Sequence, residues 1–156
     1  MSSWHNRPQV TAAYLNPALI ASIIATAARS YETGRQQPMA WPLAFIVVPL
    51  LLHRPTREQL PSSTATHLST WISRNALLQA GFAERAASLV PPIREGLRFG
   101  LRHGALTIIN GGLSGSLRPA AGADLRSLFN SARMVGRWLA KTEHPATVFA
   151  LFGVEP

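Results

Sequence analysis

104-GALTIINGGLSGSLRP-119 is the stretch that decides between three structures with different functions, because its glycines and serines suit each of them. The three are a phosphate-binding loop, a turn that presents a nucleophilic serine, and a tight β-hairpin. Asn110-Gly111 is the preferred residue pair of a type I′ turn, and residues 105–109 before it are rich in β-formers. Residues 113–117 can return along them, so the stretch predicts a hairpin.

Spacing argues against the two chemical alternatives. A phosphate-binding loop places a lysine and then a serine or threonine after its glycines, whereas Leu117, Arg118 and Pro119 follow here. A nucleophile turn requires a glycine two positions after its serine, and Ser116 occupies that position after Ser114. The hairpin is therefore the favoured structure.

The other polar residues give no candidate for catalysis or metal binding. The chain has no cysteine, its seven acids are spread thinly, and none of its five histidines has a partner at metal-ligand spacing. His53 follows an apolar run, and we interpret it as a hydrogen-bonded residue at the boundary of the core. We therefore expect no catalytic residue, no cofactor and no metal.

Length and composition indicate one domain over residues 1–156, located in the cytoplasm. The hydrophobic fraction of 47% is ordinary for a globular protein, and the absence of cysteine suits a reducing compartment. The start, MSSWHNRPQV, lacks the basic-then-apolar layout of a signal peptide. The apolar run 43–52 is about half the length of a membrane span and contains Pro49, so we expect a buried core segment there. Its leucines favour a short helix, which we prefer, whereas Ile46-Val47-Val48 favours a strand.

Apolar spacing predicts a mainly α-helical fold with one β-hairpin. The clearest helix follows Asn16, a good N-cap, and is expected to end at Gly34 in the left-handed conformation. Gly96 and Gly100 on a later helix allow a neighbouring element to approach closely, and Asp124 is expected to cap the last long helix. The apolar segment 145–156 should pack on the body. The expected helices cover residues 16–34, 43–52, 55–61, 62–75, 76–90, 92–104 and 123–144.

Basic side chains form two stripes on the predicted helices 92–104 and 123–144, and the net charge of the chain is +8. This charge indicates an anionic partner, either nucleic acid or an acidic protein surface; a merely solvated stripe is the alternative. Trp138 lies beside the second stripe as a candidate contact residue. The predicted partner-binding or DNA-binding residues are Arg94, Arg98, Arg102, Arg118, Arg126, Arg133, Arg137, Trp138 and Lys141.

A helix followed at once by a hairpin, after several short helices, is the element order of a winged helix. The second half of the chain is therefore predicted to be winged-helix-like, with the hairpin as its wing. The arginines of residues 92–104 would then meet DNA phosphates. Basic stripes also dock onto acidic proteins, so both kinds of partner stay open.

Several short phrases, in order along almost the whole chain, resemble one family. That family is the middle component of three-component ABC ATPase systems, of the third middle-component type. No phrase is specific alone, and their joint order carries the resemblance. The phrases are 16-NPA-18, 48-VPLLLH-53, 57-REQLP-61, Trp71, 82-FAERAASL-89, 95-EGLRFGL-101 with the hairpin after it, and 152-FGVEP-156.

The resemblance implies a small non-catalytic subunit, encoded between or beside an SMC/Rad50-like ABC ATPase and an effector. It further implies that the subunit bridges the two, in systems that include Lamassu-like ones and are associated with bacterial defence against phage and plasmids. A homodimer and non-specific contact with DNA stay open, and no membrane partner is expected. The alternative function is a stand-alone winged-helix DNA-binding transcriptional regulator.

Overall fold

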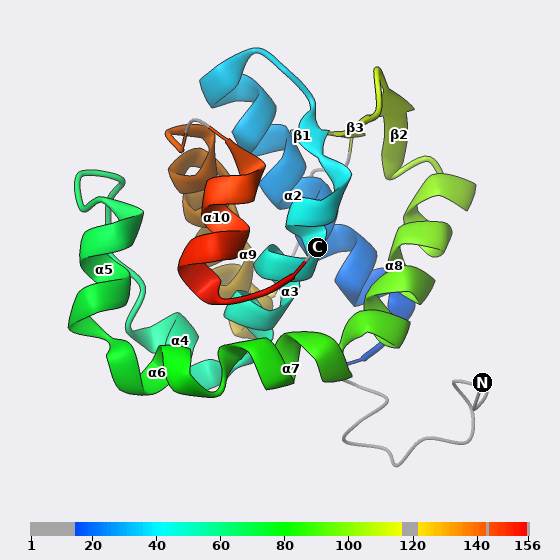
Figure 1. Ribbon diagram of the computed structural model, residues 1–156. Coiled ribbons are helices and arrows are strands. Elements are labelled where there is room, and N and C mark those ends of the chain that lie inside the picture. Colours follow the sequence, from blue (N-terminus) through cyan, green and yellow to red (C-terminus); the bar gives the residue numbers. More distant parts are fainter. Residues whose placement is uncertain (1–14, 117–121, 143, 156) are drawn as a thin grey trace.

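A computed structural model describes residues 15–116, 122–142 and 144–155 of the chain (Figure 1). Helices dominate, and a small three-stranded sheet lies at one side, so the predicted fold class, mainly α with one hairpin, is confirmed. The elements are α2 (Pro17–Arg35), β1 (Met39–Ala40), η2 (Trp41–Leu43), α3 (Ala44–Leu52), α4 (Arg54–Glu58), α5 (Leu68–Arg74), α6 (Ala76–Ala80), α7 (Phe82–Ser88), α8 (Val90–Arg102), β2 (Leu106–Ile109), β3 (Gly112–Gly115), α9 (Ala123–Ala140) and α10 (Pro145–Phe152).

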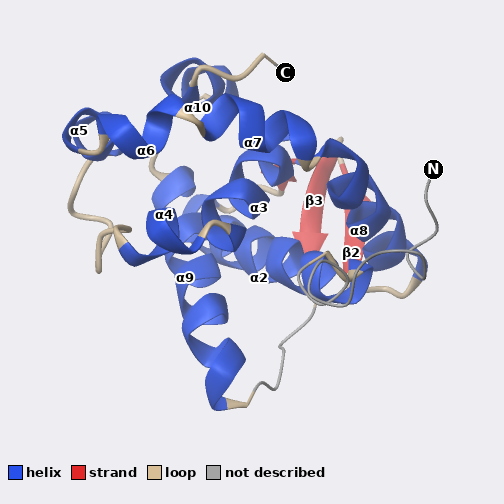
Figure 2. Cartoon of the chain, turned by 90° about the horizontal axis from the view of Figure 1, so that it is seen from below, coloured by secondary structure: helices blue, strands red, loops and turns tan. Residues whose placement is uncertain are grey.

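The helix α2 lies in the middle of the fold, between α8 on one side and α9 on the other (Figures 1 and 2). It begins as predicted, because the side chain of Asn16 accepts a hydrogen bond of 2.8 Å from the Ala18 N–H. Its predicted end at Gly34 is wrong. The helix continues to Arg35, and Gln36 takes the left-handed conformation with a φ of 58°.

Three elements approach α2 through glycines. A Cβ atom at Gly136 of α9 would overlap the carbonyl oxygen of Ala27, and one at Gly115 of β3 would overlap that of Ala25. Gly96 of α8 leaves room for the side chain of Ile20. The prediction that glycines on residues 92–104 allow close packing is confirmed. Gly115 and Gly136 thus bring β3 and α9 against the main chain of α2, while Gly96 brings α8 against the Ile20 side chain.

The hairpin forms as predicted. Asn110 and Gly111 have φ values of 50° and 77°, which is the pair of positive angles that a type I′ turn requires. The strand β3 pairs antiparallel with β2 and also with β1, giving the sheet order β1-β3-β2. The strand β1 was not predicted, because two residues are too few to give a recognisable sequence pattern. The winged-helix arrangement stays a prediction.

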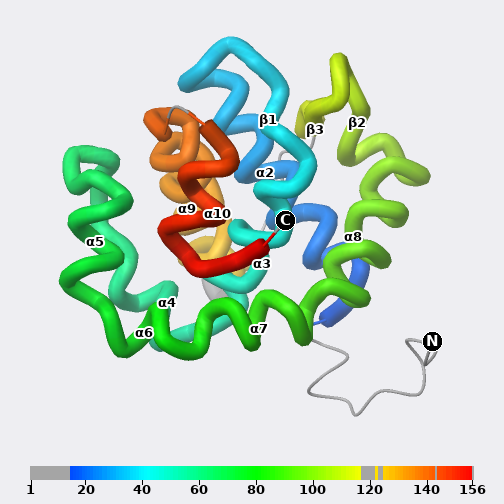
Figure 3. Tube along the Cα trace, in the orientation of Figure 1, coloured from blue at the N-terminus to red at the C-terminus, as the bar shows by residue number. Residues whose placement is uncertain are grey.

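The middle of the chain is less regular than predicted. The apolar run 43–52 does form a buried helix, α3, with Pro49 inside it. The helix expected over 62–75 begins only at Leu68, and the one expected over 76–90 is divided at Gly81 into α6 and α7. These short helices lead around the body to α8 (Figure 3). No described helix has both the length and the apolar content that crossing a membrane requires.

The last long helix, α9, begins after Gly122, so the prediction that Asp124 is its N-cap is wrong. The helix ends at Ala140, and a side chain from α2 donates hydrogen bonds to main-chain carbonyl groups at this end. The Arg35 guanidinium donates to the carbonyl oxygens of Ala140 and Thr142, at 3.2 and 3.0 Å. A cation at this position also interacts favourably with the negative end of the helix dipole.

His53 lies half-buried between α3 and α4, as its interpretation as a boundary residue predicted. Its Nδ1 is 2.6 Å from the Thr56 hydroxyl, and Thr56 itself is buried. Burial, followed by the positive charge of Arg85, holds the pKa of His53 below its ordinary value of 6.5. The neutral imidazole is therefore the form that the folded chain favours.

We expect this histidine to weaken the fold in acid. Because the pKa is lower in the folded than in the unfolded chain, the stabilisation is complete above pH 6.5 and is lost as the pH falls through the folded-state pKa. Urea unfolding across this range should show that His53→Gln, whose amide can still contact Thr56, reduces the loss of stability in acid. An unchanged pH dependence in this variant would contradict the assignment.

Candidate partner-binding surfaces

The first basic stripe lies on the side of α8 that faces away from α2. Arg94, Arg98 and Arg102 are all exposed, and they follow one another at i, i+4 spacing. The opposite side of the helix carries Gly96 and Gly100, which are buried against α2 and β2. We call this set of three exposed arginines the α8 surface. Its guanidinium groups make no hydrogen bond or ion pair within the described chain.

Apolar side chains flank the α8 surface. Phe99 is 36% exposed and stacks on His103 with ring centroids 4.2 Å apart, and Leu101 is 38% exposed. At the other end of the helix, Arg94 borders an apolar pocket of about 510 Å³ beside the exposed Trp41. Exposed rings and aliphatic groups beside cations are typical of a surface that binds a protein partner.

The second stripe lies on α9 and is also accessible. Arg126, Arg137 and Lys141 are exposed, while Arg133 is half-buried and donates a hydrogen bond of 2.8 Å to the side chain of Asn130. We call these four residues the α9 surface. The apolar residues on the other side of this helix are buried against the core, apart from Leu125, which is 40% exposed.

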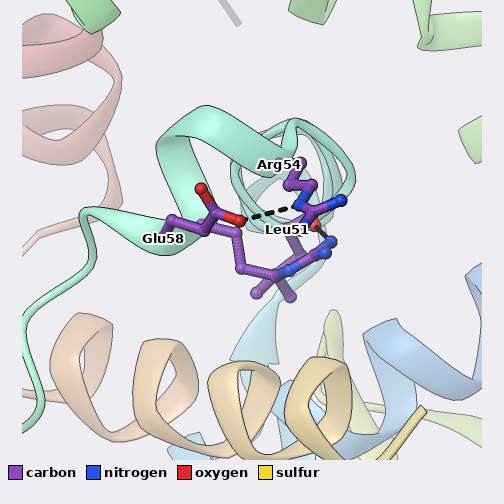
Figure 4. A network of polar contacts seen from close by, with 4 residues as sticks. Leu51, Arg54 and Glu58 are labelled. Carbon is purple, nitrogen blue, oxygen red and sulfur yellow. Dashed lines mark hydrogen bonds and ion pairs between the residues drawn. The ribbon is translucent and has the colours of Figure 1, made fainter. Parts of the chain in front are cut away.

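A shallow pocket of about 470 Å³ with a mixed polar and apolar lining adjoins the α9 surface, and it contains an arginine that sequence reasoning missed. Arg57 of α4 and Arg126 of α9 both line it, together with serine and asparagine side chains. Arg57 donates a hydrogen bond of 2.7 Å to the Leu51 carbonyl oxygen, and Glu58 pairs instead with Arg54 at 2.7 Å (Figure 4). Sequence spacing gave no signal for this pair, because α4 and α9 meet only in the fold.

The two surfaces do not join into one patch. Since α2 lies between α8 and α9, the arginines of one helix are separated from those of the other by the central helix (Figures 1 and 2). Gly136 of α9 lies against the main chain of Ala27, and Gly96 of α8 lies against the Ile20 side chain, so both helices pack closely on α2. The fold therefore presents two separate basic surfaces.

Trp138 is removed from the candidate contacts, because its side chain is only 2% exposed. Its indole N–H donates a hydrogen bond of 2.8 Å to the Thr66 carbonyl oxygen, and its ring packs edge-on against Trp71 with centroids 5.4 Å apart. Trp138 was predicted as a contact residue because it is next to Arg137 in the sequence. Adjacent residues of a helix point in different directions, so Trp138 can be buried while Arg137 is exposed. Arg118 lies outside the described residues.

Ser114, in the hairpin, has a structural partner. The Ser114 hydroxyl donates a hydrogen bond of 2.8 Å to the Glu32 carboxylate and so ties β3 to α2. Among the described residues, no group of three or more histidine, cysteine, aspartate or glutamate side chains could hold a metal ion.

Comparison with known proteins agrees with the resemblance noted from sequence phrases. The family of middle component 3 of ABC-three component (ABC-3C) systems matches residues 4–156. No curated protein and no solved structure matches the chain. Because the family match extends over nearly all of the sequence, the chain belongs to the middle component 3 family of ABC-three component systems.

Proposed function

We propose that this protein is a non-catalytic accessory subunit that bridges an SMC/Rad50-like ABC ATPase and an effector in a bacterial anti-phage and anti-plasmid defence complex. In this proposal ATP hydrolysis belongs to the partner. The α8 surface binds one partner and the α9 surface binds the other. Membership of a middle-component family supports the accessory role alongside an ABC ATPase.

The observation that carries the bridging role is the separation of two exposed arginine surfaces by α2. A subunit that touched a single partner would need only one such surface. Arginine suits these contacts, because its planar guanidinium can bind a carboxylate with two hydrogen bonds and can also stack on apolar groups. One exposed ion pair contributes less than about 1 kcal/mol, so each surface acts through several residues.

The test is capture of the two proteins encoded beside this chain by variants with one reversed charge. We expect Arg98→Glu to weaken capture of one partner by about fivefold, and Arg137→Glu to weaken capture of the other to a similar degree. The reason is that reversal removes an attraction and adds a repulsion. Arg74→Glu on α5 is the matched control, since Arg74 is exposed and belongs to neither surface.

Two outcomes would contradict the proposal. One is that both surface variants lose the same partner, which would remove the bridging role. The other is that the purified chain binds one DNA sequence tightly without either partner, which would favour the stand-alone regulator. Weak DNA binding whose affinity falls steeply with salt concentration would mean only that DNA phosphates bind the arginines without recognition of sequence.

A further inference from the structure

The strand β2 is one of the two outer strands of the sheet, and within the described residues one of its edges has no neighbouring strand. In the sheet order β1-β3-β2, only β3 pairs with it. Natural edge strands are commonly protected by lysine, proline or a bulge, and Leu106–Ile109 contains none of these. The edge is therefore chemically able to accept another strand.

The register identifies which main-chain groups are free. Ile109 and Gly112 flank the two-residue turn and form a hydrogen-bonded pair, so hydrogen-bonded and non-bonded pairs alternate from there along the hairpin. The Ser116 N–H donates to the Ala105 carbonyl oxygen at 3.1 Å, as this alternation requires. Thr107 therefore bonds to β3, whereas the residues on either side of it turn their N–H and C=O groups outward.

Those outward groups belong to Leu106 and Ile108, and no hydrogen bond from another part of the described chain reaches them. The side chain of Ile108 is 61% exposed, and that of Ile109 is 42% exposed. An added strand could therefore form hydrogen bonds with these outward main-chain groups and apolar contacts with the two solvent-exposed isoleucines.

The charge beside this edge indicates what the added strand carries. The helix α8 ends at Arg102, three residues before Ala105, so the exposed Arg98 and Arg102 belong to the last turns of the helix that leads directly into β2. Glu95 is the one acid among residues 90–116. An incoming segment with carboxylates would gain ion pairs with the arginines, while a basic segment would be repelled.

We propose that β2 binds an extended acidic segment of a partner protein, which pairs with Leu106 and Ile108 as a fourth strand and directs carboxylates to Arg98 and Arg102. The inference rests on the proposed partner-binding role of the α8 surface and states what chemistry that partner brings. A second copy of this chain is a poorer occupant, because each copy carries a net charge of +8 and would bring its own α8 arginines to the contact.

The experiment uses the full chain and a synthetic probe, a capped peptide of alternating glutamate and valine. Amide hydrogen exchange with and without the peptide should show new protection at Leu106 and Ile108. Protection at Thr107 and Ile109 should not change, since their N–H groups already bond to β3. A peptide of alternating lysine and valine should protect none of the four.

The matched variants are Ile108→Pro and Ile108→Thr. Proline removes one outward N–H and leaves every bond between β2 and β3 in place, so peptide affinity should fall about tenfold. Threonine keeps the N–H and the branched shape, so it should retain most of the affinity. Circular dichroism of both variants checks that the fold is retained.

Three outcomes would overturn the inference: protection spread evenly along β2, equal binding of the lysine peptide, or unchanged affinity in Ile108→Pro. Self-association of the chain through β2 would do the same, because it would make a second copy the occupant. The peptide experiment needs neither the ATPase nor the effector. Its failure is therefore distinguishable from failure of the bridging role, which the capture experiment tests separately.

Discussion

Replacing Trp138 with alanine is expected to lower the free energy of unfolding by about 3–5 kcal/mol, a large part of what holds a domain of this size together. The ring is 2% exposed and packs edge-on against Trp71, so its removal leaves a cavity and separates α9 from α5. The lost N–H also leaves the Thr66 carbonyl oxygen without its partner. Urea unfolding followed by circular dichroism measures the change.

Two further variants define the cause. Trp138→Phe keeps most of the packing and loses only the N–H, so its cost should be nearer ~1–2 kcal/mol. Trp41 is 52% exposed, and Trp41→Ala should change stability by less than about 1 kcal/mol. If Trp138→Ala were as stable as Trp41→Ala, the residue would not belong to the core and its role as a contact residue would have to be reconsidered.

Gly136→Val is expected to destabilise the fold by about 3 kcal/mol. A Cβ atom at this position would overlap the Ala27 carbonyl oxygen and lie 2.9 Å from the Ser30 Cβ. The obstacle is partly main chain of α2, which cannot move aside as the end of a flexible side chain can. Relief would require α9 to shift away from α2 along much of its length.

The control for this substitution is Gly122→Ser at the start of the same helix. A Cβ atom there meets nothing within 4 Å, and serine is a favourable N-cap residue. Its thermal unfolding should match that of the native chain or occur at a slightly higher temperature. Equal loss in both variants would mean that Gly136 matters for local helix geometry and not for its approach to α2.

Local signals predicted the parts of the fold that depend on neighbours in sequence. Asn110-Gly111 predicted the turn, because few residue pairs accept two successive positive φ angles. Asn16 predicted the start of α2, because its side chain bonds to a main-chain group two residues away. The i, i+4 spacing of arginines predicted the α8 surface, since the exposed side of a helix follows its period.

Features that depend on distant contacts could not be predicted in this way. The burial of Trp138 and the pocket between Arg57 and Arg126 depend on which helices meet, and sequence spacing carries no record of that. Helix ends show the same limit. The helix α2 continues past Gly34 to Arg35, and the Arg35 side chain bonds to the end of α9. That partner helix begins about ninety residues later in the sequence, so no local signal near Gly34 indicates the contact.

The glycine contacts on α2 also indicate which positions of the chain tolerate substitution and which do not. The carbonyl oxygen of Ala25 lies against Gly115, and that of Ala27 lies against Gly136. A larger side chain at either glycine would therefore collide with main chain, which cannot move aside. The exposed arginines of α8 and α9 have no such constraint. Recognition residues can therefore be exchanged for a new partner one at a time, while Gly115 and Gly136, which approach the main chain of the central helix, have to remain glycines.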